Sequence, residues 1–502
     1  MTPETVDPRR RTLIVFSTTL ASMIFAVDTS IANVALPNMQ ATMGVTGEQI
    51  IWVVTSYMIA SAIATPLSSW LASRYGRKPM LLISVGGFTL ASVACGLAND
   101  LTTAVIARSI QGITGAGMVP LSQAAVIDIT PQKDYGKAMG ILGLGTMIGP
   151  LIGPTLGGWL TVTLDWRWVY FINLPIGLIS FAGLAIGLYD ARDDKPLRFD
   201  LFGFVALSIL LGAFQLILDR GHLLDWFDSR EILLYAVLMA LFGFLMAVHM
   251  FTARDTYVRP QIFADRNFAL GCVLSIAMGV LTFSTIPLTV VMMQHNLHYT
   301  PFYAGLISSP RSIGTLISML LVVRLIGKVD SRWFLAGGLA MNAVGLKMLS
   351  SISLEVDESH LLLAGLFQGF GSGLMFPPLT ALIFATIPPA YRNEGSAMFA
   401  PTRSMGSSLG ISYLQTLTTQ NTAIVGARLV EGVRPDNPVM QNAMPDFDFG
   451  SLPHLTGMKG MIFNQANMVG YVDAYWLIFL LALAMVPVVM LMRPPNQSKP
   501  GA

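Results

Sequence analysis

The sequence predicts an all-helical integral membrane protein that crosses the bilayer many times. Of its 502 residues, 53% are hydrophobic and 12% are charged, about half the charged fraction of an ordinary soluble protein. Apolar stretches long enough to cross a hydrocarbon core of ~30 Å, at ~1.5 Å per helical residue, recur along the whole chain. The alternating pattern of barrel strands is absent, and helices satisfy their own backbone hydrogen bonds in lipid.

Fourteen apolar segments are long enough to be membrane spans. They cover roughly residues 12–36, 50–71, 79–98, 102–127, 138–161, 168–188, 201–219, 231–252, 268–293, 302–324, 333–353, 360–385, 396–420 and 472–492. The first follows three arginines, as a signal peptide would, but its apolar run is longer, at about 25 residues, and contains Asp28. We therefore interpret it as a retained first helix.

An even number of spans places both termini on one side of the membrane. The terminal segments and the alternate loops on their side hold 20 of the 30 lysines and arginines, whereas the opposite loops hold six. Basic residues concentrate in cytoplasmic loops. We therefore expect both termini to be cytoplasmic.

An internal repeat relates the two ends of the chain. Gln111-Gly112 in the fourth span matches Gln368-Gly369 in the twelfth, and the same offset of 257 positions relates Gly149 to Gly406. Transporters are often built from such repeats. We expect an N-terminal six-helix bundle over residues 1–190, two inserted helices over 191–253 and a C-terminal six-helix bundle over 254–502.

A polar stretch over residues 421–470 separates the last two spans on the outer side. It contains several proline and asparagine residues and is too long for a tight helix connection. We expect a long loop that is either a mobile surface or a docking element, and a solvated loop without a role remains the alternative.

Charged residues inside a bilayer are costly and usually functional. Asp28 lies eight residues, ~12 Å, below the outer end of the first span, and Arg108 lies about six residues, ~9 Å, below the outer start of the fourth. Their similar depth allows a direct or water-mediated pair. Burial favours a neutral carboxyl and a neighbouring arginine favours a charged one, so withdrawal of Arg108 would drive proton uptake by Asp28. At the repeat offset, Asp28 maps to Thr285 and Arg108 to Gly365, so only the first bundle carries these charges.

Further polar residues in the spans are candidates for a substrate pathway. For Arg403 a structural role, hydrogen-bonded to broken backbone, is the alternative, and for Arg311 the alternatives are contact with a substrate anion or a structural role. Lys347 lies near a helix end, where snorkelling is expected. The pathway candidates are Asn33, Gln111, Arg311, Gln368 and Arg403.

Composition excludes several other classes. The net charge of +2 gives no reason to expect nucleic-acid binding, and both cysteines, Cys95 and Cys272, fall inside apolar segments, which excludes a disulfide framework or zinc site. The histidines lie mostly in loops, which argues against a metal centre. Neither an ATPase phosphate loop nor H-E-x-x-H occurs, so we expect no cofactor and no enzymatic activity, with a proton gradient as the energy source.

Several motifs resemble those of the major facilitator superfamily. Residues 69–78 resemble its cytoplasmic loop consensus G-x-L-A-D-R-x-G-R-K, with Ser69 and Ser73 in place of Gly and Asp; the missing Asp removes one member of the charge relay usually assigned to this loop. Arg108-x-x-Gln111-Gly112 resembles its helix-4 motif. The matching loop residues are Arg74, Gly76, Arg77 and Lys78.

The fifth span resembles the antiporter motif of that superfamily. Glycines four residues apart form one stripe on a helix, where a facing helix can approach closely, and prolines bend the helix. Ordinary small-residue packing is the alternative to a gate that seals one side of the pathway. The motif residues are Gly145, Gly149, Pro150, Gly153, Pro154, Gly157 and Gly158.

More specific segments resemble the EmrB-type multidrug pumps among the fourteen-helix drug/proton antiporters. These are residues 28–37, 166–177, 218–221 and 224–227. The resemblance implies the major facilitator fold and proton-coupled export of hydrophobic compounds from the inner membrane of a double-membrane bacterium. It also implies a periplasmic adaptor and an outer-membrane channel as partners. A transporter of one metabolite, an intramembrane lipid-modifying protein and a passive channel are the alternatives.

Overall fold

The computed structural model describes residues 7–131, 135–189, 200–221, 223–252, 261–325, 329–387 and 392–493. Within them, ten helical segments are long and apolar enough to cross a membrane. Four further helices of 19 to 40 residues, α3, α7, α16 and α18, occupy the remaining predicted segments. The described structure therefore agrees with the prediction of an all-helical protein with fourteen spans.

The N-terminal bundle contains the first six predicted spans, and the fourth and sixth are each divided into two helices. Its elements are α1 (Pro8–Met43), α2 (Gly47–Ile50), α3 (Trp52–Tyr75), α4 (Arg77–Leu97), α5 (Leu101–Gly115), α6 (Met118–Ile129), α7 (Tyr135–Thr163), α8 (Trp168–Phe171) and α9 (Asn173–Gly187). Helix α1 lies at the centre, because it packs against α6, α7, α8 and α9.

The two inserted helices do not form a separate unit. Helix α10 (Leu201–Gly221) packs against both α3 and α18, and the Ser412 hydroxyl donates to the Leu218 carbonyl oxygen at 2.5 Å. Helix α11 (Arg230–Thr252) packs on α10. Only 11% of the residues in its most apolar stretch are buried inside the protein. Its apolar side chains are suited to face lipid, so α10 is the inserted helix that joins the bundles.

The C-terminal bundle repeats the architecture of the first. Its elements are α12 (Gln261–Ala264), α13 (Arg266–Met278), the π-helical turn η4 (Gly279–Ser284), α14 (Thr285–His295), α15 (Pro301–Leu325), α16 (Ser331–Leu349), α17 (Glu358–Thr386), α18 (Arg392–Glu431), α19 (Pro438–Ala443) and α20 (Leu452–Met490). At Gly406 in α18 a Cβ would overlap the Ile276 carbonyl group, so glycine is required for this close approach.

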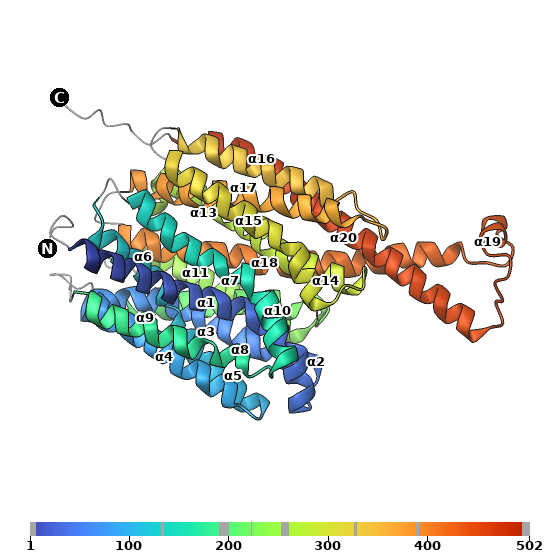
Figure 1. Ribbon diagram of the computed structural model, residues 1–502, viewed down its shortest axis with the longest axis horizontal. Coiled ribbons are helices and arrows are strands. Elements are labelled where there is room, and N and C mark those ends of the chain that lie inside the picture. Colours follow the sequence, from blue (N-terminus) through green and yellow to red (C-terminus); the bar gives the residue numbers. More distant parts are fainter. Residues whose placement is uncertain are drawn as a thin grey trace.

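The predicted loop over residues 421–470 is wrong in its secondary structure. Helix α18 continues to Glu431 and α20 already begins at Leu452, so most of the segment is a helical hairpin with α19 near its tip. Figure 1 shows this hairpin projecting from the bundle at the end opposite the start of α1 and the end of α20. The two helices support each other beyond the bundle, with Gly426 packed against Ala466. Hydropathy marks where a helix leaves lipid, and polar residues can continue the same helix.

The loop motif between α3 and α4 forms a tight turn and an ion pair. Gly76 has φ +100°, a conformation that side chains other than glycine rarely adopt. Arg77, which follows it, pairs with Asp128 of α6. Arg74 lies over the rings of Trp70 and Tyr75 instead. The carboxylate absent at position 73 is thus supplied to the motif from another helix.

Candidate transport and proton-coupling site

Asp28 lies in the middle of α1 with no solvent exposure. Three side chains donate hydrogen bonds to its carboxylate. Arg108 Nη1 reaches Oδ2 at 2.6 Å, and Gln111 Nε2 and Asn173 Nδ2 both reach Oδ1 at 2.9 Å. The donors come from α5 and α9, so the carboxylate joins three helices. Both carboxylate oxygens are therefore held by hydrogen bonds in a site with no solvent exposure.

Arg108 is held from several directions. It donates to Gln111 Oε1 at 2.7 Å and from Nε to the Val53 carbonyl oxygen of α3 at 3.2 Å. Its guanidinium carbon lies 4.3 Å from the ring centre of Tyr57 and 5.4 Å from that of Tyr170. Cation–π contacts are strongest where water is excluded, and Arg108 is 1% exposed.

The direct contact between Asp28 and Arg108, predicted from their depth, is present. Sequence reasoning missed three other members of the network. Asn173 and Tyr170 fall within the family-like segment 166–177, which could have indicated them, whereas Tyr57 is a single aromatic residue among many. Asn173 also donates to the Ser92 hydroxyl of α4 at 2.8 Å, which fixes its amide toward Asp28.

The glycine stripe of α7 packs on α1 directly behind Asp28. A Cβ at Gly149 would overlap the carbonyl group of Ala26, and one at Gly153 would lie 2.7 Å from Ser30 Cβ. Gly145 and Gly157 contact α1 in the same way, whereas a Cβ at Gly158 would meet nothing within 4 Å. The predicted close helix contact is therefore present, and it lies within the N-terminal bundle. The side chains of Pro150 and Pro154 lie outside the described residues, so the bend stays a prediction.

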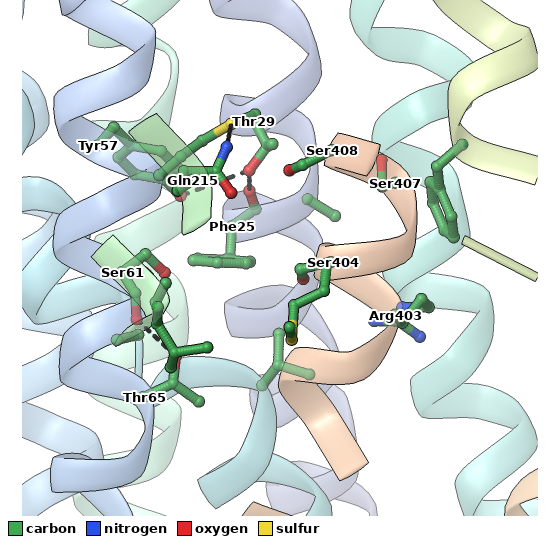
Figure 2. A pocket seen from close by; sticks show the side chains of 18 of the residues that line it. Phe25, Thr29, Tyr57, Ser61, Thr65, Gln215, Arg403, Ser404, Ser407 and Ser408 are labelled. Atoms are coloured by element: carbon green, nitrogen blue, oxygen red, sulfur yellow. Dashed lines mark hydrogen bonds between the residues drawn. The ribbon is translucent and has the colours of Figure 1, made fainter. Parts of the chain in front are cut away.

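A central cavity of about 260 Å³ lies between the two bundles. Figure 2 shows Phe25 and Tyr57 on the side of the N-terminal bundle, facing Ser404 and Ser408 of α18. The inserted helix α10 contributes Gln215 to the wall, together with Leu211 and Phe214. A cavity with a mostly apolar lining and a few polar groups is typical of small-molecule sites.

The cavity and the buried charge network share a wall. Thr29 follows Asp28 in α1 and lines the cavity, as does Tyr57, and their hydroxyl groups lie 3.4 Å apart. The ring of Tyr57 covers the guanidinium of Arg108. A molecule that moves Tyr57 would therefore act directly on the environment of the Asp28–Arg108 pair.

Arg403 is the only side chain with a formal charge among the described residues that line the central cavity. Its guanidinium carbon lies 4.7 Å from the ring centre of Phe376 and 5.6 Å from that of Phe283. The cavity thus carries one positive charge in an aromatic setting.

The other four pathway candidates do not line this cavity. Gln111 belongs to the network around Asp28, and Arg311 and Gln368 contact each other inside the C-terminal bundle. Asn33 is exposed one turn beyond Thr29, to whose carbonyl oxygen it donates. Residue type and depth do not determine which way a helical side chain points, so a role of these four residues in a substrate pathway stays a prediction.

No metal site is formed by the described histidine, cysteine and carboxylate side chains. Residues 406–410 have the G-x-S-x-G spacing of an esterase nucleophile, but they lie in the middle of helix α18. The esterase motif requires a strand-to-helix turn that exposes the serine.

Comparison with known proteins decides the family. The model of the Major Facilitator Superfamily matches residues 18–286 and 270–427. The chain belongs to the major facilitator superfamily. Members of this superfamily are membrane transporters, and the chain is a multi-pass transporter, not an enzyme.

Relatives share sequence over nearly the whole chain. The multidrug export protein EmrB of Escherichia coli is 30% identical, covering 95% of this chain and 94% of its own length. The protein of the same name from Haemophilus influenzae is 28% identical, with 96% of both chains covered. Among solved structures, a POT family peptide transporter superposes with a TM-score of 0.62 at 15% identity, over 98% of this chain and 99% of that one. That likeness supports the fold alone.

Removing Arg108 should destabilise the protein more than removing the pair. Arg108→Met leaves a buried carboxylate without its cation, which costs on the order of 3–5 kcal/mol. The double variant Asp28→Asn/Arg108→Met removes both charges and should recover most of that loss. Thermal unfolding of the detergent-purified variants measures the difference. Equal melting temperatures for the single and double variants would show that the two charges are not energetically coupled.

Proposed function

We propose that the protein is a proton-coupled antiporter that exports hydrophobic compounds. One observation carries the proposal: the Asp28–Arg108 network and the central cavity share Thr29 and Tyr57. Antiport requires that a proton and a substrate influence the same element. The names of the EmrB relatives, which are multidrug export proteins, support hydrophobic substrates, as do the aromatic lining and α10 wall of the cavity.

Coupling follows from the electrostatics of the network. Protonation of Asp28 removes the negative charge that faces Arg108 Nη1 at 2.6 Å. Arg108 then keeps only neutral partners, Gln111, the Val53 carbonyl and the aromatic faces, so its position is less strongly fixed. A substrate that packs against Tyr57 stabilises one position of that ring and so favours one protonation state. Proton and substrate thereby compete through a shared side chain.

Proton-linked export in proteoliposomes tests the function. A fluorescent hydrophobic dye should be moved against its concentration gradient when a pH gradient is imposed. Adding dye should also cause protons to cross the membrane in the opposite direction, which a pH probe inside the vesicles measures. Dye movement without proton movement would contradict antiport. A panel of unrelated hydrophobic compounds separates multidrug export from transport of one metabolite, because only the former predicts mutual competition among many compounds.

We further propose that the protein lies in the inner membrane of a bacterium with its termini in the cytoplasm. The 20-to-6 distribution of basic residues supports this orientation. The hairpin of α18 and α20 then projects into the periplasm, where exposed apolar side chains such as Val439 (73%) and Leu452 (75%) are available. A periplasmic adaptor, leading to an outer-membrane channel, is the partner that this surface suits.

Shortening the hairpin should separate transport from assembly. Replacing residues 430–460 by a short Gly/Ser linker keeps the packed pair Gly426 and Ala466, and keeps the hydrogen bond from Asn296 to the Asn464 carbonyl oxygen at 3.0 Å. Dye–proton exchange in proteoliposomes should be unchanged, because the cavity is untouched. Adaptor co-purification and cellular drug resistance should fall at least tenfold. Retention of the adaptor by this variant would place the docking surface elsewhere.

A further inference from the structure

The C-terminal bundle contains a second arginine centre, in which the arginine is partly buried. Arg311 of α15 donates from Nη1 to Gln368 Oε1 at 2.9 Å, and from Nη2 to Thr285 Oγ1 at 2.9 Å and the Thr282 carbonyl oxygen at 2.7 Å. All three acceptors are neutral. Among the described residues, no carboxylate forms an ion pair with Arg311, so the centre carries an uncompensated positive charge inside the membrane-spanning region.

This centre occupies the repeat position of the Asp28 network. The offset of 257 pairs Asp28 with Thr285, Gln111 with Gln368, and Arg108 with Gly365. Arg108 contacts the aspartate and the glutamine of its bundle, and Arg311 contacts the threonine and the glutamine at the matching positions. The guanidinium therefore reaches the equivalent place from a different helix. The second centre has neutral Thr285 at the position of Asp28, so it lacks a carboxylate to balance the arginine.

The amide of Gln368 provides an independent indication of a missing acceptor. Arginine has only donors, so the amide oxygen of Gln368 must face Arg311 and its NH₂ group must point elsewhere. That Nε2 is buried and has no hydrogen-bond partner, in a residue that is 1% exposed. A buried donor without an acceptor is uncommon. An acceptor beside Gln368 would satisfy it.

A small cavity adjoins both groups. It measures about 30 Å³ and is lined by Arg311, Gln368 and Gly365, with Thr289 and Ser308 among the polar residues. One water needs roughly 10–15 Å³ on this scale, so the space accepts a monatomic ion and is too small for a long-chain organic anion. Gly365 stands where the first bundle has the side chain of Arg108, which is why space is left here.

We propose that this cavity, the Arg311 site, binds a small inorganic anion of the size of chloride. The anion supplies the negative charge that Asp28 supplies in the first bundle. It also accepts hydrogen bonds from the unpaired Nε2 amide group of Gln368. Water would satisfy the donors but would leave the partly buried cation of Arg311 without a counter-charge, which is costly inside a membrane-spanning bundle. The site shares no lining residue with the central cavity. Unlike Asp28, the bound anion does not take up a proton, so the charge of Arg311 stays balanced throughout transport.

Anion-dependent stability of the purified full-length protein tests the site. The melting temperature is measured at fixed pH and ionic strength in sodium gluconate, chloride and bromide. We expect a rise of roughly 2–4 °C when gluconate is replaced by chloride, a similar rise in bromide, and a bromide anomalous peak beside Arg311 in crystals. Equal melting temperatures in the three salts, or competition between a long-chain carboxylate and chloride, would overturn the proposal.

Three variants make the test specific. Arg311→Gln should abolish the chloride response. Gly365→Ala should raise the chloride concentration at half-effect at least tenfold, because its Cβ enters the cavity while its nearest neighbour, Arg311, is 3.7 Å away and ordinary contact is preserved. Lys347→Gln removes another cation of the same bundle, one that lies over Trp476, and should respond like the natural protein. If Arg311→Gln does not fold, an unchanged chloride response in Gly365→Ala refutes the site. This outcome is independent of transport activity.

Discussion

Replacing Asp28 by asparagine should abolish transport driven by a pH gradient. An asparagine side chain has almost the same shape but cannot bind and release a proton. We expect the rate of proton-driven dye export in proteoliposomes to fall at least 100-fold. This loss corresponds to an increase of about 2.7 kcal/mol in the activation free energy of transport. Undiminished pH-driven export by Asp28→Asn would remove this residue from the coupling mechanism.

Folding must be separated from coupling in this variant. Asp28 accepts from Arg108 on one oxygen and from Gln111 and Asn173 on the other. An asparagine amide keeps only one oxygen acceptor, and its NH₂ group replaces the other. That NH₂ group then faces a hydrogen-bond donor, at a cost of about 1–3 kcal/mol in folding free energy. Dye binding and size-exclusion behaviour should therefore persist with a lowered melting temperature. Asp28→Glu should remain partly active, because the titratable group survives in a shifted position.

Asp473 offers the matched control. Its carboxylate lies on the transporter's α20, is exposed, and accepts a hydrogen bond from Asn421 at 2.9 Å. Asp473→Asn makes the same chemical change outside both the central cavity and the Asp28 network. It should export dye at the natural rate.

Replacing Gly149 by leucine should stop transport without preventing membrane insertion. The Cβ alone would overlap the Ala26 carbonyl group, so the larger side chain forces α7 away from α1 at a point two residues before Asp28. Overpacking of this kind costs about 1–3 kcal/mol, and leucine itself favours lipid. We expect dye export to fall at least tenfold while the amount of protein in the membrane stays near normal.

Two alanine variants isolate the steric effect. Gly149→Ala should already impair export, because its Cβ is the atom that overlaps Ala26. Gly158→Ala adds the same group on the same helix where nothing lies within 4 Å, and should transport normally. Equal activity of the two variants would show that close approach of α7 to α1 is not required.

Local composition determined much of this protein. Hydropathy fixes which segments lie in lipid, and the sign of loop charges favours one orientation, because both depend on the residues of each segment alone. Depth along a helix rises by a constant ~1.5 Å per residue, so Asp28 and Arg108 were predicted to be within reach. The spacing of Gly145, Gly149 and Gly153 predicted a close helix contact for the same reason.

Only the tertiary structure decided how the segments meet. It assigned α1 as the partner of the glycine stripe, brought Asn173 of α9 onto Asp28, and placed α10 in the cavity wall. It also showed that α18 and α20 extend beyond the bundle as a hairpin, in a segment where hydropathy predicted a loop. The repeat did not predict the position of Arg311. Its guanidinium contacts Gln368 and Thr285, as a side chain at position 365 would do by analogy with Arg108. Such relations depend on side-chain direction and on packing between helices far apart in the chain, and the pattern within one segment does not contain them.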